Sequence, residues 1–396
     1  MEKIPVGILG ATGMVGQKYV RLLSDHPWFR VAYIAASPRS AGKPYSQAVA
    51  GRWHVDGSSL STDGLNPSTD GSSLSTGGST EGSNPAGGWG PGVGSLIVED
   101  ANEVSTALAA HKAGRCSFVF SALEMGKEEI KTLEEAYASA GIPVVSNASA
   151  HRWTRDVPML IAEINPHHAD IIPLQRKNRG WDRGFIVVKP NCSIQSYTTP
   201  LWALIRAGYE IKRLSVTTMQ AVSGAGYPGI PSWDMIDNLV PYIGGEEEKS
   251  EQEPLKIFGS IGDGAFINAA EPKISAHCNR VPVSDGHTAC VSLEFGAKKP
   301  TIDEVKKIWA DFRALPQEEN FPSAPPRPII LREEPDRPQP RKDRDAGRGM
   351  AVTVGRVRPC PVFDLRFTGL SHNTVRGAAG GGILNAELLT YKGYLS

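Results

Sequence analysis

The sequence lacks any apolar stretch long enough to cross a membrane. Its apolar runs fall short of the roughly 20 residues that a spanning helix needs. The first three residues, Met1-Glu2-Lys3, lead directly into a strand-like segment and not into a secretory leader. We therefore expect a soluble, cytoplasmic protein with no membrane partner.

The chain also lacks an excess of charge of either sign. Lys plus Arg and Asp plus Glu both number 42, so the formal net charge is zero. Without a basic surplus, no long-range field favours binding to a phosphate backbone or to anionic lipid. We expect a small-molecule partner and no nucleic acid.

Cysteine is scarce and scattered. No C-x-x-C pair occurs, which excludes a disulfide-stapled module and favours reduced thiols. The five cysteines are Cys116, Cys192, Cys278, Cys290 and Cys360. The spacing of His277, Cys278, His287 and Cys290 matches no zinc pattern, and no Gly-x-Ser-x-Gly elbow is present. We expect neither a metal centre nor serine-based hydrolysis.

A chain of 396 residues that is 40% hydrophobic is large enough for two domains. Short β-rich runs alternate with helical patterns in the first third, as in the amphipathic segment 14–23. The runs are 6–9, 31–36, 96–99, 117–121 and 143–146. This alternation predicts an α/β fold, a Rossmann-type doubly wound parallel sheet over residues 1–155.

Residues 56–94 interrupt that pattern. Gly, Ser, Thr, Pro and Asn dominate, and Asp-Gly-Ser-Ser-Leu-Ser-Thr occurs twice, at 56–62 and 70–76. Such a composition buries too little apolar surface to offset its ordering entropy. We expect a flexible low-complexity insertion, with a binding role as the alternative.

The rest of the chain indicates a second, mixed α+β domain at 156–370 for catalysis and oligomerisation. Its expected elements are a helix at 193–207, strands at 215–221, 288–295, 351–357 and 363–367, and a Pro-rich excursion at 322–348. A last helix at 373–391, within 371–396, is expected to return to the first domain.

A dinucleotide site is indicated where the first strand ends. Gly10-Ala11-Thr12-Gly13-Met14-Val15-Gly16 places glycines three apart at a strand-to-helix turn, where the backbone can approach a pyrophosphate. The alternative is a glycine-tolerant turn without a ligand. After the second strand, Ser37-Pro38-Arg39-Ser40 replaces the acidic residue typical of NAD sites, which favours NADP. A solvated arginine is the alternative there.

A nucleophile is indicated at Cys192. It follows the strand-like Ile186-Val187-Val188 and precedes a helical pattern, and a thiol at a helix N-terminus is favoured as thiolate. The alternative, a buried structural cysteine, is the interpretation for the other four thiols. Among nine histidines, His287 precedes a strand at the expected rim, so it is a candidate acid and base titrating near neutrality. Arg280 is a candidate carboxylate clamp or a surface charge.

Four motifs in order resemble the aspartate-semialdehyde dehydrogenase family, in its fungal and archaeal branch. They are the Gly10 to Gly16 turn, Pro190-Asn191-Cys192-Ser193, Gln220-Ala221-Val222-Ser223-Gly224, and Arg280 to His287. The resemblance covers nearly the whole chain except the 56–94 insertion.

The resemblance implies a role for each matching residue. Cys192 would attack the acyl group, His287 would act as acid and base, and Gln220 would orient the intermediate. N–H groups near Asn191 and Cys192 would hold the oxyanion. Arg280 would hold the substrate α-carboxylate, and Glu246 with Lys249 would meet the amino group and the phosphate. Arg152 would also contact the phosphate. NADP would be lined by Gly10, Thr12, Gly13, Met14, Val15, Ser37, Arg39, Ser40, Ser121, Ser223 to Gly226 and Asn385. The alternative interpretation of Glu246 and Lys249 is a charged run on a solvated helix face. The alternative for Asn385 is a residue on the surface of a helix.

The implied reaction is the NADPH-dependent reduction of L-aspartyl 4-phosphate to L-aspartate 4-semialdehyde and inorganic phosphate through a cysteine thioester. It serves biosynthesis of the aspartate family of amino acids, threonine and methionine among them. A homodimer or homotetramer is implied as well. Two alternatives stay open: a reductase of the N-acetyl-γ-glutamyl-phosphate type, and a non-catalytic nucleotide-binding interaction protein.

Overall fold

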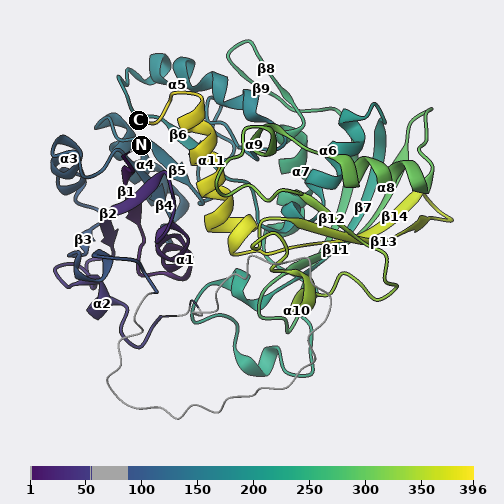
Figure 1. Ribbon diagram of the computed structural model, residues 1–396, viewed down its shortest axis with the longest axis horizontal. Coiled ribbons are helices and arrows are strands. Elements are labelled where there is room, and N and C mark those ends of the chain that lie inside the picture. The colour runs from purple at the N-terminus through teal and green to yellow at the C-terminus, as the bar shows by residue number, and fades with distance from the viewer. Residues whose placement is uncertain (1, 54, 56–87) are drawn as a thin grey trace.

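The computed structural model describes residues 2–53, 55 and 88–396. Two sheets lie side by side, and a helix, α11 (Gly380–Tyr391), runs between them (Figure 1). Both ends of the chain lie beside the first sheet. Among the helices of the described residues, none combines the length and the apolar character that crossing a bilayer requires.

The first sheet is parallel, in the order β3-β2-β1-β4-β5-β6. Its strands are β1 (Ile4–Leu9), β2 (Phe29–Ala36), β3 (Glu99–Asp100), β4 (Phe118–Ser121), β5 (Val144–Ser146) and β6 (Ile186–Val188). Helices cover both faces, so the strands are apolar and buried, as at Val6 and Phe120. The predicted doubly wound sheet is confirmed, and its order reverses between β1 and β4, where such sheets bind ligands.

The helices of this half are α1 (Met14–Leu23), α2 (Tyr45–Ala48), α3 (Val104–Lys112), α4 (Lys127–Ser139) and α5 (Ile172–Arg179). Two boundaries differ from the sequence expectation. The third strand is Glu99–Asp100 and not 96–99, and the sheet takes its sixth strand, β6, from beyond residue 155. Strand pairing across the sheet decides both boundaries, and local sequence does not report it.

The predicted insertion at 56–94 lies mostly outside the described residues, which resume at Gly88. The chain is packed again from there, because the ring of Trp89 contacts two other rings edge to face. The centroid of Trp89 lies 5.1 Å from that of Trp53 and 6.1 Å from that of Tyr45. Residues 88–94 therefore belong to the packed fold and not to the insertion.

The second sheet is mixed, in the order β10-β7-β11-β14-β13-β12. Its strands are β7 (Ile211–Gln220), β10 (Lys273–Arg280), β11 (His287–Phe295), β12 (Ile329–Arg332), β13 (Val352–Pro359) and β14 (Leu365–Ser371). Burial alternates along β7, so one face is covered and the other is open. The Trp309 indole in α8 (Ile302–Asp311) fills the covered face, donating to the carbonyl of Pro200 at 2.9 Å.

The remaining elements are α6 (Thr198–Arg206), α7 (Glu246–Ile257), α9 (Leu315–Glu318), α10 (Pro340–Asp343), and the hairpin β8 (Ser260–Gly262) and β9 (Ala265–Ile267). The excursion predicted at 322–348 thus contributes an edge strand, β12, and the short helix α10. The single helix predicted at 193–207 is wrong, because a 3-10 turn, Ser193–Ser196, is separated from α6 by Tyr197. Pro200 lacks an N–H and fits only the first turn of a helix, so α6 begins just before it.

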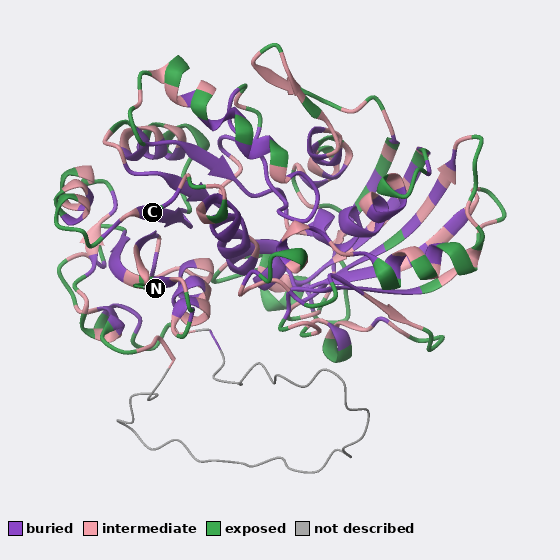
Figure 2. Cartoon of the chain, turned by 45° about the horizontal axis from the view of Figure 1, so that its top comes forward, coloured by how far each residue is buried: buried purple, intermediate pink, exposed green. Residues whose placement is uncertain are grey.

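The C-terminal helix α11 follows a π-helical turn, Val375–Ala379, and is buried almost throughout (Figure 2). It contacts α1 and β5 of the first half. A helix buried on all sides needs no polar stripe, which explains the run of Gly, Ala, Ile and Leu in its sequence.

Candidate active site

The sulfur of Cys192 lies 3.4 Å from Nε2 of His287. Cys192 lies four residues after Val188, the end of β6 in the first sheet, and His287 begins β11 in the second sheet. The two residues are 95 positions apart in the chain. The contact between the two halves of the fold therefore assembles the pair that the sequence indicated.

The protonation expected for Cys192 from its position is wrong. The segment after it is a four-residue 3-10 turn, too short to carry the dipole of an α-helix. Burial raises the pKa of the Cys192 thiol, and the nearby carboxylate of Glu246 raises it further, while the cations Lys189, Arg152 and Arg280 oppose the shift. Burial first, and then the surrounding charges, shift the pKa of this thiol, and a helix terminus does not.

The imidazole of His287 is fully buried, and its protonation differs from expectation too. Burial lowers the pKa of His287 to about 3, with Arg280 as the next cause, so it does not titrate near neutrality. Its Nδ1 accepts the backbone N–H of Ala221 at 3.0 Å. A nitrogen that accepts a hydrogen bond carries no proton, so the neutral ring holds its proton on Nε2, facing Cys192.

The carboxylate of Glu246 connects three other predicted site residues. It accepts Nδ2 of Asn191 at 2.9 and 3.0 Å, Nε2 of Gln220 at 3.2 Å and Nζ of Lys249 at 2.8 Å. Burial alone would raise the pKa of Glu246, but Lys249 and these donors lower it overall. The alternative of a solvated charged run fails for Glu246, which is buried.

Arg280 ends β10 beside Gln220, its partner in the register with β7. Its Nη1 donates to the carbonyl of Ala221 at 2.7 Å. Its Nε is buried and has no hydrogen-bond partner among residues 2–53, 55 and 88–396. A buried donor without a partner is costly, which suits a group that pairs with a ligand oxygen. The surface-charge alternative is excluded, because only 5% of Arg280 is exposed.

Sequence reasoning missed Glu253, the anchor of this site. Its carboxylate accepts Nη1 of Arg152 at 2.8 Å and the backbone N–H of Asn191 at 2.6 Å. Arg152 also donates to the carbonyls of Lys189 and Asn147. Arg152 is thus committed to the protein, and its contact with phosphate stays a prediction. The only sequence signal for Glu253 was its place in a charged helix, which usually marks a solvated face.

These bonds restrict the choice of oxyanion donor. The N–H of Asn191 is taken by Glu253, and the N–H of Ser193 donates to Oδ1 of Asn191 at 2.7 Å. Of these three consecutive N–H groups, only that of Cys192 is without a bond among the described residues. Of the N–H groups expected near Asn191 and Cys192 to hold an oxyanion, that of Cys192 is therefore the available one.

The other four thiols differ among themselves. Cys116 and Cys278 are buried, as expected for structural cysteines, but Cys290 is exposed and Cys360 is partly exposed. Cys290 lies on the open face of the second sheet, where β11 alternates, so the buried interpretation is wrong for it. In the part of the chain that the structure describes, no three His, Cys, Asp or Glu side chains group to hold a metal.

Two family models match the chain. The NAD binding domain of semialdehyde dehydrogenase matches residues 5–65 and 86–172, and its dimerisation domain matches residues 201–376. The aspartate-semialdehyde dehydrogenase of Archaeoglobus fulgidus is 43% identical over 97% of both chains, and that of Schizosaccharomyces pombe is 41% identical over 98% of this chain and 99% of its own.

This chain belongs to the aspartate-semialdehyde dehydrogenase family.

A solved structure supports the same assignment. The crystal structure of aspartate-semialdehyde dehydrogenase with NADP from Candida albicans superposes with a TM-score of 0.79, at 36% identity, over 98% of this chain and 99% of that one. The predicted resemblance to the fungal and archaeal branch is confirmed, since relatives from both groups match over nearly the full length.

The glycine turn has the shape that a dehydrogenase of this family needs for a dinucleotide. Gly10 has a φ of +76°, and a Cβ there would lie 2.3 Å from the carbonyl of Ala122; a Cβ on Gly16 would lie 2.1 Å from the carbonyl of Gly10. Thr12 and Gly13 complete the turn, and Met14 and Val15 open α1. The turn lies at the carboxyl end of β1, and its backbone N–H groups suit a pyrophosphate.

The other predicted cofactor residues lie in two places. Ser37, Arg39 and Ser40 lie in a turn after β2, in which the N–H of Ser40 donates a hydrogen bond of 2.9 Å to the carbonyl of Ser37. The side chain of Arg39 is exposed. Ser223 and Gly224 lie in a 3-10 turn, Val222–Ala225, where a Cβ on Gly224 would touch both Arg280 and His287. That turn therefore packs closely against Arg280 and His287. Contact of these residues with NADP stays a prediction.

Ser121 differs from the others because its hydroxyl is already engaged. It donates to Glu134 at 2.6 Å, as does the hydroxyl of Ser146. Burial raises the pKa of Glu134 to about 7. Ser121 is fully buried, so only its backbone remains to line the cofactor edge.

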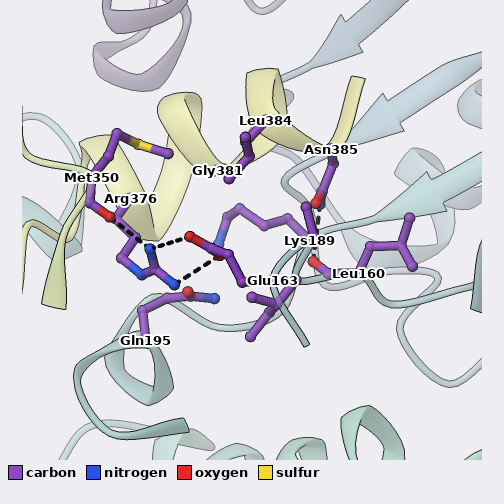
Figure 3. Close-up of a pocket in the computed structure, with 11 residues that line it drawn as sticks. Leu160, Glu163, Lys189, Gln195, Met350, Arg376, Gly381, Leu384 and Asn385 are labelled. Atoms are coloured by element: carbon purple, nitrogen blue, oxygen red, sulfur yellow. Dashed lines mark hydrogen bonds and ion pairs between the residues drawn. The ribbon is translucent and has the colours of Figure 1, made fainter. Parts of the chain in front are cut away.

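Asn385 lines a small pocket together with Lys189, Glu163 and Arg376 (Figure 3). It donates to the carbonyl of Leu160 at 2.9 Å, and it is buried, which excludes the surface alternative. Arg376 forms two bonds of 3.0 Å to Glu163 and ties the start of α11 to the first half. Burial lowers the pKa of Lys189 to about 7. Lys189, Glu163 and Arg376 were not anticipated from the sequence.

Proposed function

We propose that this chain catalyses the NADPH-dependent reduction of L-aspartyl 4-phosphate to L-aspartate 4-semialdehyde, with release of phosphate. The observation that supports the proposal most directly is the 3.4 Å approach of the Cys192 sulfur to His287. Binding alone requires no nucleophile beside a proton donor, so this pair speaks against a non-catalytic role.

In the first step, the Cys192 thiol loses its proton to solvent, and the resulting thiolate attacks the acyl carbon of the substrate. The carbon–sulfur bond forms, the carbon–oxygen bond to phosphate breaks, and the leaving phosphate takes the electron pair. The Nε2–H of His287 stabilises the sulfur anion before attack by donating a hydrogen bond. Lys189, Arg152 and Arg280 favour the same anion electrostatically.

In the second step, the thioester becomes an aldehyde. NADPH, when bound, supplies the hydride that reduces the thioester carbon. The carbonyl oxygen then bears a negative charge, which the backbone N–H of Cys192 stabilises. The carbon–sulfur bond breaks and the aldehyde leaves. The restored thiolate again accepts a hydrogen bond from the Nε2–H of His287. Acyl phosphate, NADPH and one proton, which the leaving phosphate takes from solvent, are consumed, and aldehyde, hydrogen phosphate and NADP are released.

The polar groups around the pair suit an amino acid substrate. The buried carboxylate of Glu246 suits a free α-ammonium group, and the Nε of Arg280 suits an α-carboxylate. Lys249, whose side chain is 26% exposed, is the more accessible of the two predicted phosphate contacts. An N-acetylated substrate would leave Glu246 facing a neutral amide, which favours the aspartyl substrate over the N-acetylglutamyl one.

The residues present fit NADP. The crowded glycine turn leaves no room for side chains and so permits close approach of a pyrophosphate, and Arg39 lies exposed after β2, between Ser37 and Ser40. Gly10 to Val15 would hold the pyrophosphate, and Arg39 with the two serines would hold the 2′-phosphate. The matched dimerisation domain supports an oligomer, and we infer a homodimer or a homotetramer.

The test is phosphate-dependent reduction of NADP with aspartate semialdehyde, run beside N-acetylglutamate semialdehyde. We expect turnover with the first aldehyde only. Cys192→Ala should abolish turnover and leave NADP binding unchanged in a fluorescence titration. Turnover by the alanine variant would rule out the thioester route, and turnover with only the N-acetylated aldehyde would reassign the substrate.

A further inference from the structure

A cavity of about 460 Å³ lies between α1 in the first half of the fold and loops of the second half. Lys18, Arg21 and Leu22 line it from α1, and Gly380 and Ile383 line it from α11, which lies beside α1 in Figure 1. We call it the α1 cavity. None of the predicted catalytic, substrate or cofactor residues is among the described residues that line it. Its volume is typical of a small-molecule site, so it is a second place where a ligand can bind.

Charges of both signs line the α1 cavity in nearly equal number. Among the described lining residues, the cations are Lys18, Arg21, Arg344 and Arg348, and the anions are Asp25, Asp285 and Asp345. The field inside the cavity is therefore neither strongly positive nor strongly negative, which disfavours a ligand with charges of one sign only. A zwitterion, which carries both a carboxylate and an ammonium group, suits such walls.

Two of the arginines have no acidic partner. Arg348 donates its Nη2 to the carbonyl of Pro322 at 2.7 Å, and Arg21 donates its Nη1 to the hydroxyl of Ser24 at 3.3 Å. In the part of the chain that the structure describes, neither guanidinium forms an ion pair. Each guanidinium has further N–H donors in a planar fork, which matches the geometry of a carboxylate. The two arginines are therefore suited to the carboxylate of a ligand.

Acidic side chains of the cavity gather around His372. The carboxylate of Asp345 lies 3.7 Å from Nε2 of His372 and 3.8 Å from Nε of Arg344, and both distances are longer than a hydrogen bond. Burial lowers the pKa of His372 to about 4, an effect that Asp285 and Asp345 oppose and that Lys18 and Arg344 increase. The imidazole is neutral at neutral pH and does not compensate the two carboxylates. Asp285 and Asp345 are therefore suited to the ammonium group of a ligand.

Apolar side chains complete the lining, and they are those of Leu22, Met350, Val375 and Ile383. We propose that the α1 cavity binds a free α-amino acid with an apolar side chain. Arg21 and Arg348 hold its carboxylate. Asp285 and Asp345 hold its ammonium group, and its side chain packs against the apolar part of the lining. The amino acid is an effector and not a substrate, because it binds away from the catalytic pair.

The cavity is connected to the predicted cofactor turn by two hydrogen bonds. Gly286 follows Asp285 in the chain, Asn373 follows His372, and the N–H of Gly286 donates to Oδ1 of Asn373 at 2.8 Å. Nδ2 of Asn373 in turn donates to the hydroxyl of Ser223 at 2.8 Å, in the turn proposed to line NADP. A ligand that restrains Asp285 and His372 also restrains Ser223. The bound amino acid therefore tightens the binding of NADP, and NADP tightens the binding of the amino acid.

The experiment is isothermal titration calorimetry of the full chain, without substrate, with L-leucine as the probe. We expect one site per chain. Isocaproate is leucine without its ammonium group, and isoamylamine is leucine without its carboxylate. Each should bind roughly tenfold more weakly or worse, because each loses a charge-assisted pair. At saturating leucine, the Kd for NADP should fall roughly fivefold or more.

A double variant, Arg21→Gln with Arg348→Asn, tests the assignment to the α1 cavity. Its affinity for L-leucine should fall roughly tenfold or more. Asn suits position 348, where the φ is +59°. Arg313→Gln is the matched control, because Arg313 also donates to nearby carbonyls but is not among the described residues that line the cavity. Arg280→Ala, in the proposed substrate site, should bind L-leucine like the parent.

An absence of leucine binding, or full binding by the double variant, would overturn the inference. Loss of binding in Arg280→Ala alone would place leucine in the substrate site and overturn it as well. Equal affinity for isocaproate would contradict the zwitterion, and an unchanged Kd for NADP would contradict the coupling. Because the titrations contain no substrate, a chain that binds leucine but has no turnover contradicts only the proposed reaction.

Discussion

The backbone of Ala221 holds the side chains of His287 and Arg280 together. Its N–H donates to Nδ1 of His287 at 3.0 Å, and its carbonyl accepts Nη1 of Arg280 at 2.7 Å. One peptide group at the end of β7 thus orients two side chains from β11 and β10. It also fixes the tautomer of His287, because Nδ1 cannot carry a proton of its own while it accepts a hydrogen bond.

The first prediction concerns that tautomer. In protein labelled with ¹⁵N at histidine, His287 should be neutral and protonated at Nε2 from pH 8 down to pH 5, since burial lowers its pKa to about 3. Long-range ¹H–¹⁵N correlation spectra distinguish the two nitrogens. The signal of His287 is identified as the one that is absent from the spectrum of the His287→Gln variant. A proton found on Nδ1 would contradict the geometry.

The second prediction separates hydrogen bonding from proton exchange at position 287. His287→Ala should lower kcat by roughly 10²–10⁴-fold. His287→Gln, whose amide can still donate toward Cys192, should retain roughly 10- to 100-fold more activity than the alanine variant, because one charge-assisted hydrogen bond contributes about 1.5–3 kcal/mol. Steady-state rates at saturating substrate provide the comparison. Equal losses in both variants would show that a titrating group is essential.

The third prediction concerns the buried anchor Glu253. Glu253→Ala leaves Arg152 buried without its counter-charge, so the free energy of unfolding should fall by about 3–5 kcal/mol. The kcat of the folded protein should fall too, since Asn191 loses the acceptor of its N–H. Urea unfolding and initial rates measure the two effects.

Glu248→Ala is the matched control for Glu253, because Glu248 is exposed on the same helix, α7. Its effect on unfolding should stay within about 0.5 kcal/mol. If the two variants have the same unfolding midpoint, Glu253 is not an anchor.

The fourth prediction concerns the cofactor. Arg39→Ala should raise the KM for NADPH roughly 10- to 100-fold, the effect of losing one charge-assisted bond of about 1.5–3 kcal/mol, and leave the KM for NADH unchanged. Arg30→Ala, an exposed arginine near the opposite end of β2, should change neither value. A parallel loss with both cofactors would place Arg39 away from the 2′-phosphate.

The fifth prediction is a loss of stability in mild acid. Burial lowers the pKa of His168 and His372 to about 4 and that of His287 to about 3, from an ordinary value of 6.5. Below pH 6.5 the unfolded chain binds protons that the folded chain does not, so the free energy of unfolding falls as the pH falls. Glu134, with its pKa raised to about 7, opposes this trend, but it is one group against three.

Urea unfolding at pH 7.5, 6.5, 5.5 and 4.5 measures that trend. The free energy of unfolding should fall by at least about 1 kcal/mol per pH unit below pH 6.5. A flat profile down to pH 4.5 would mean that these imidazoles are accessible to protons in the folded protein.

The sequence by itself determined the features that depend on neighbouring residues. Apolar runs separated by helical patterns specified the parallel sheet, because a strand buried on both faces needs apolar residues throughout. Crowding at Gly16 comes from the nearby backbone of Gly10 and Ala11, so the strand-to-helix turn was readable as well. Cys192 was identified from its place after a strand.

Only the tertiary structure decided which distant groups meet and how they are charged. Nothing local distinguishes His287 among nine histidines, and nothing in a charged helix singles out Glu253, since both depend on pairing across the two halves of the fold. A pKa reflects burial and the sum of surrounding charges in space. For that reason the expected thiolate and the expected neutral-pH titration were wrong, although the residues that carry them were identified.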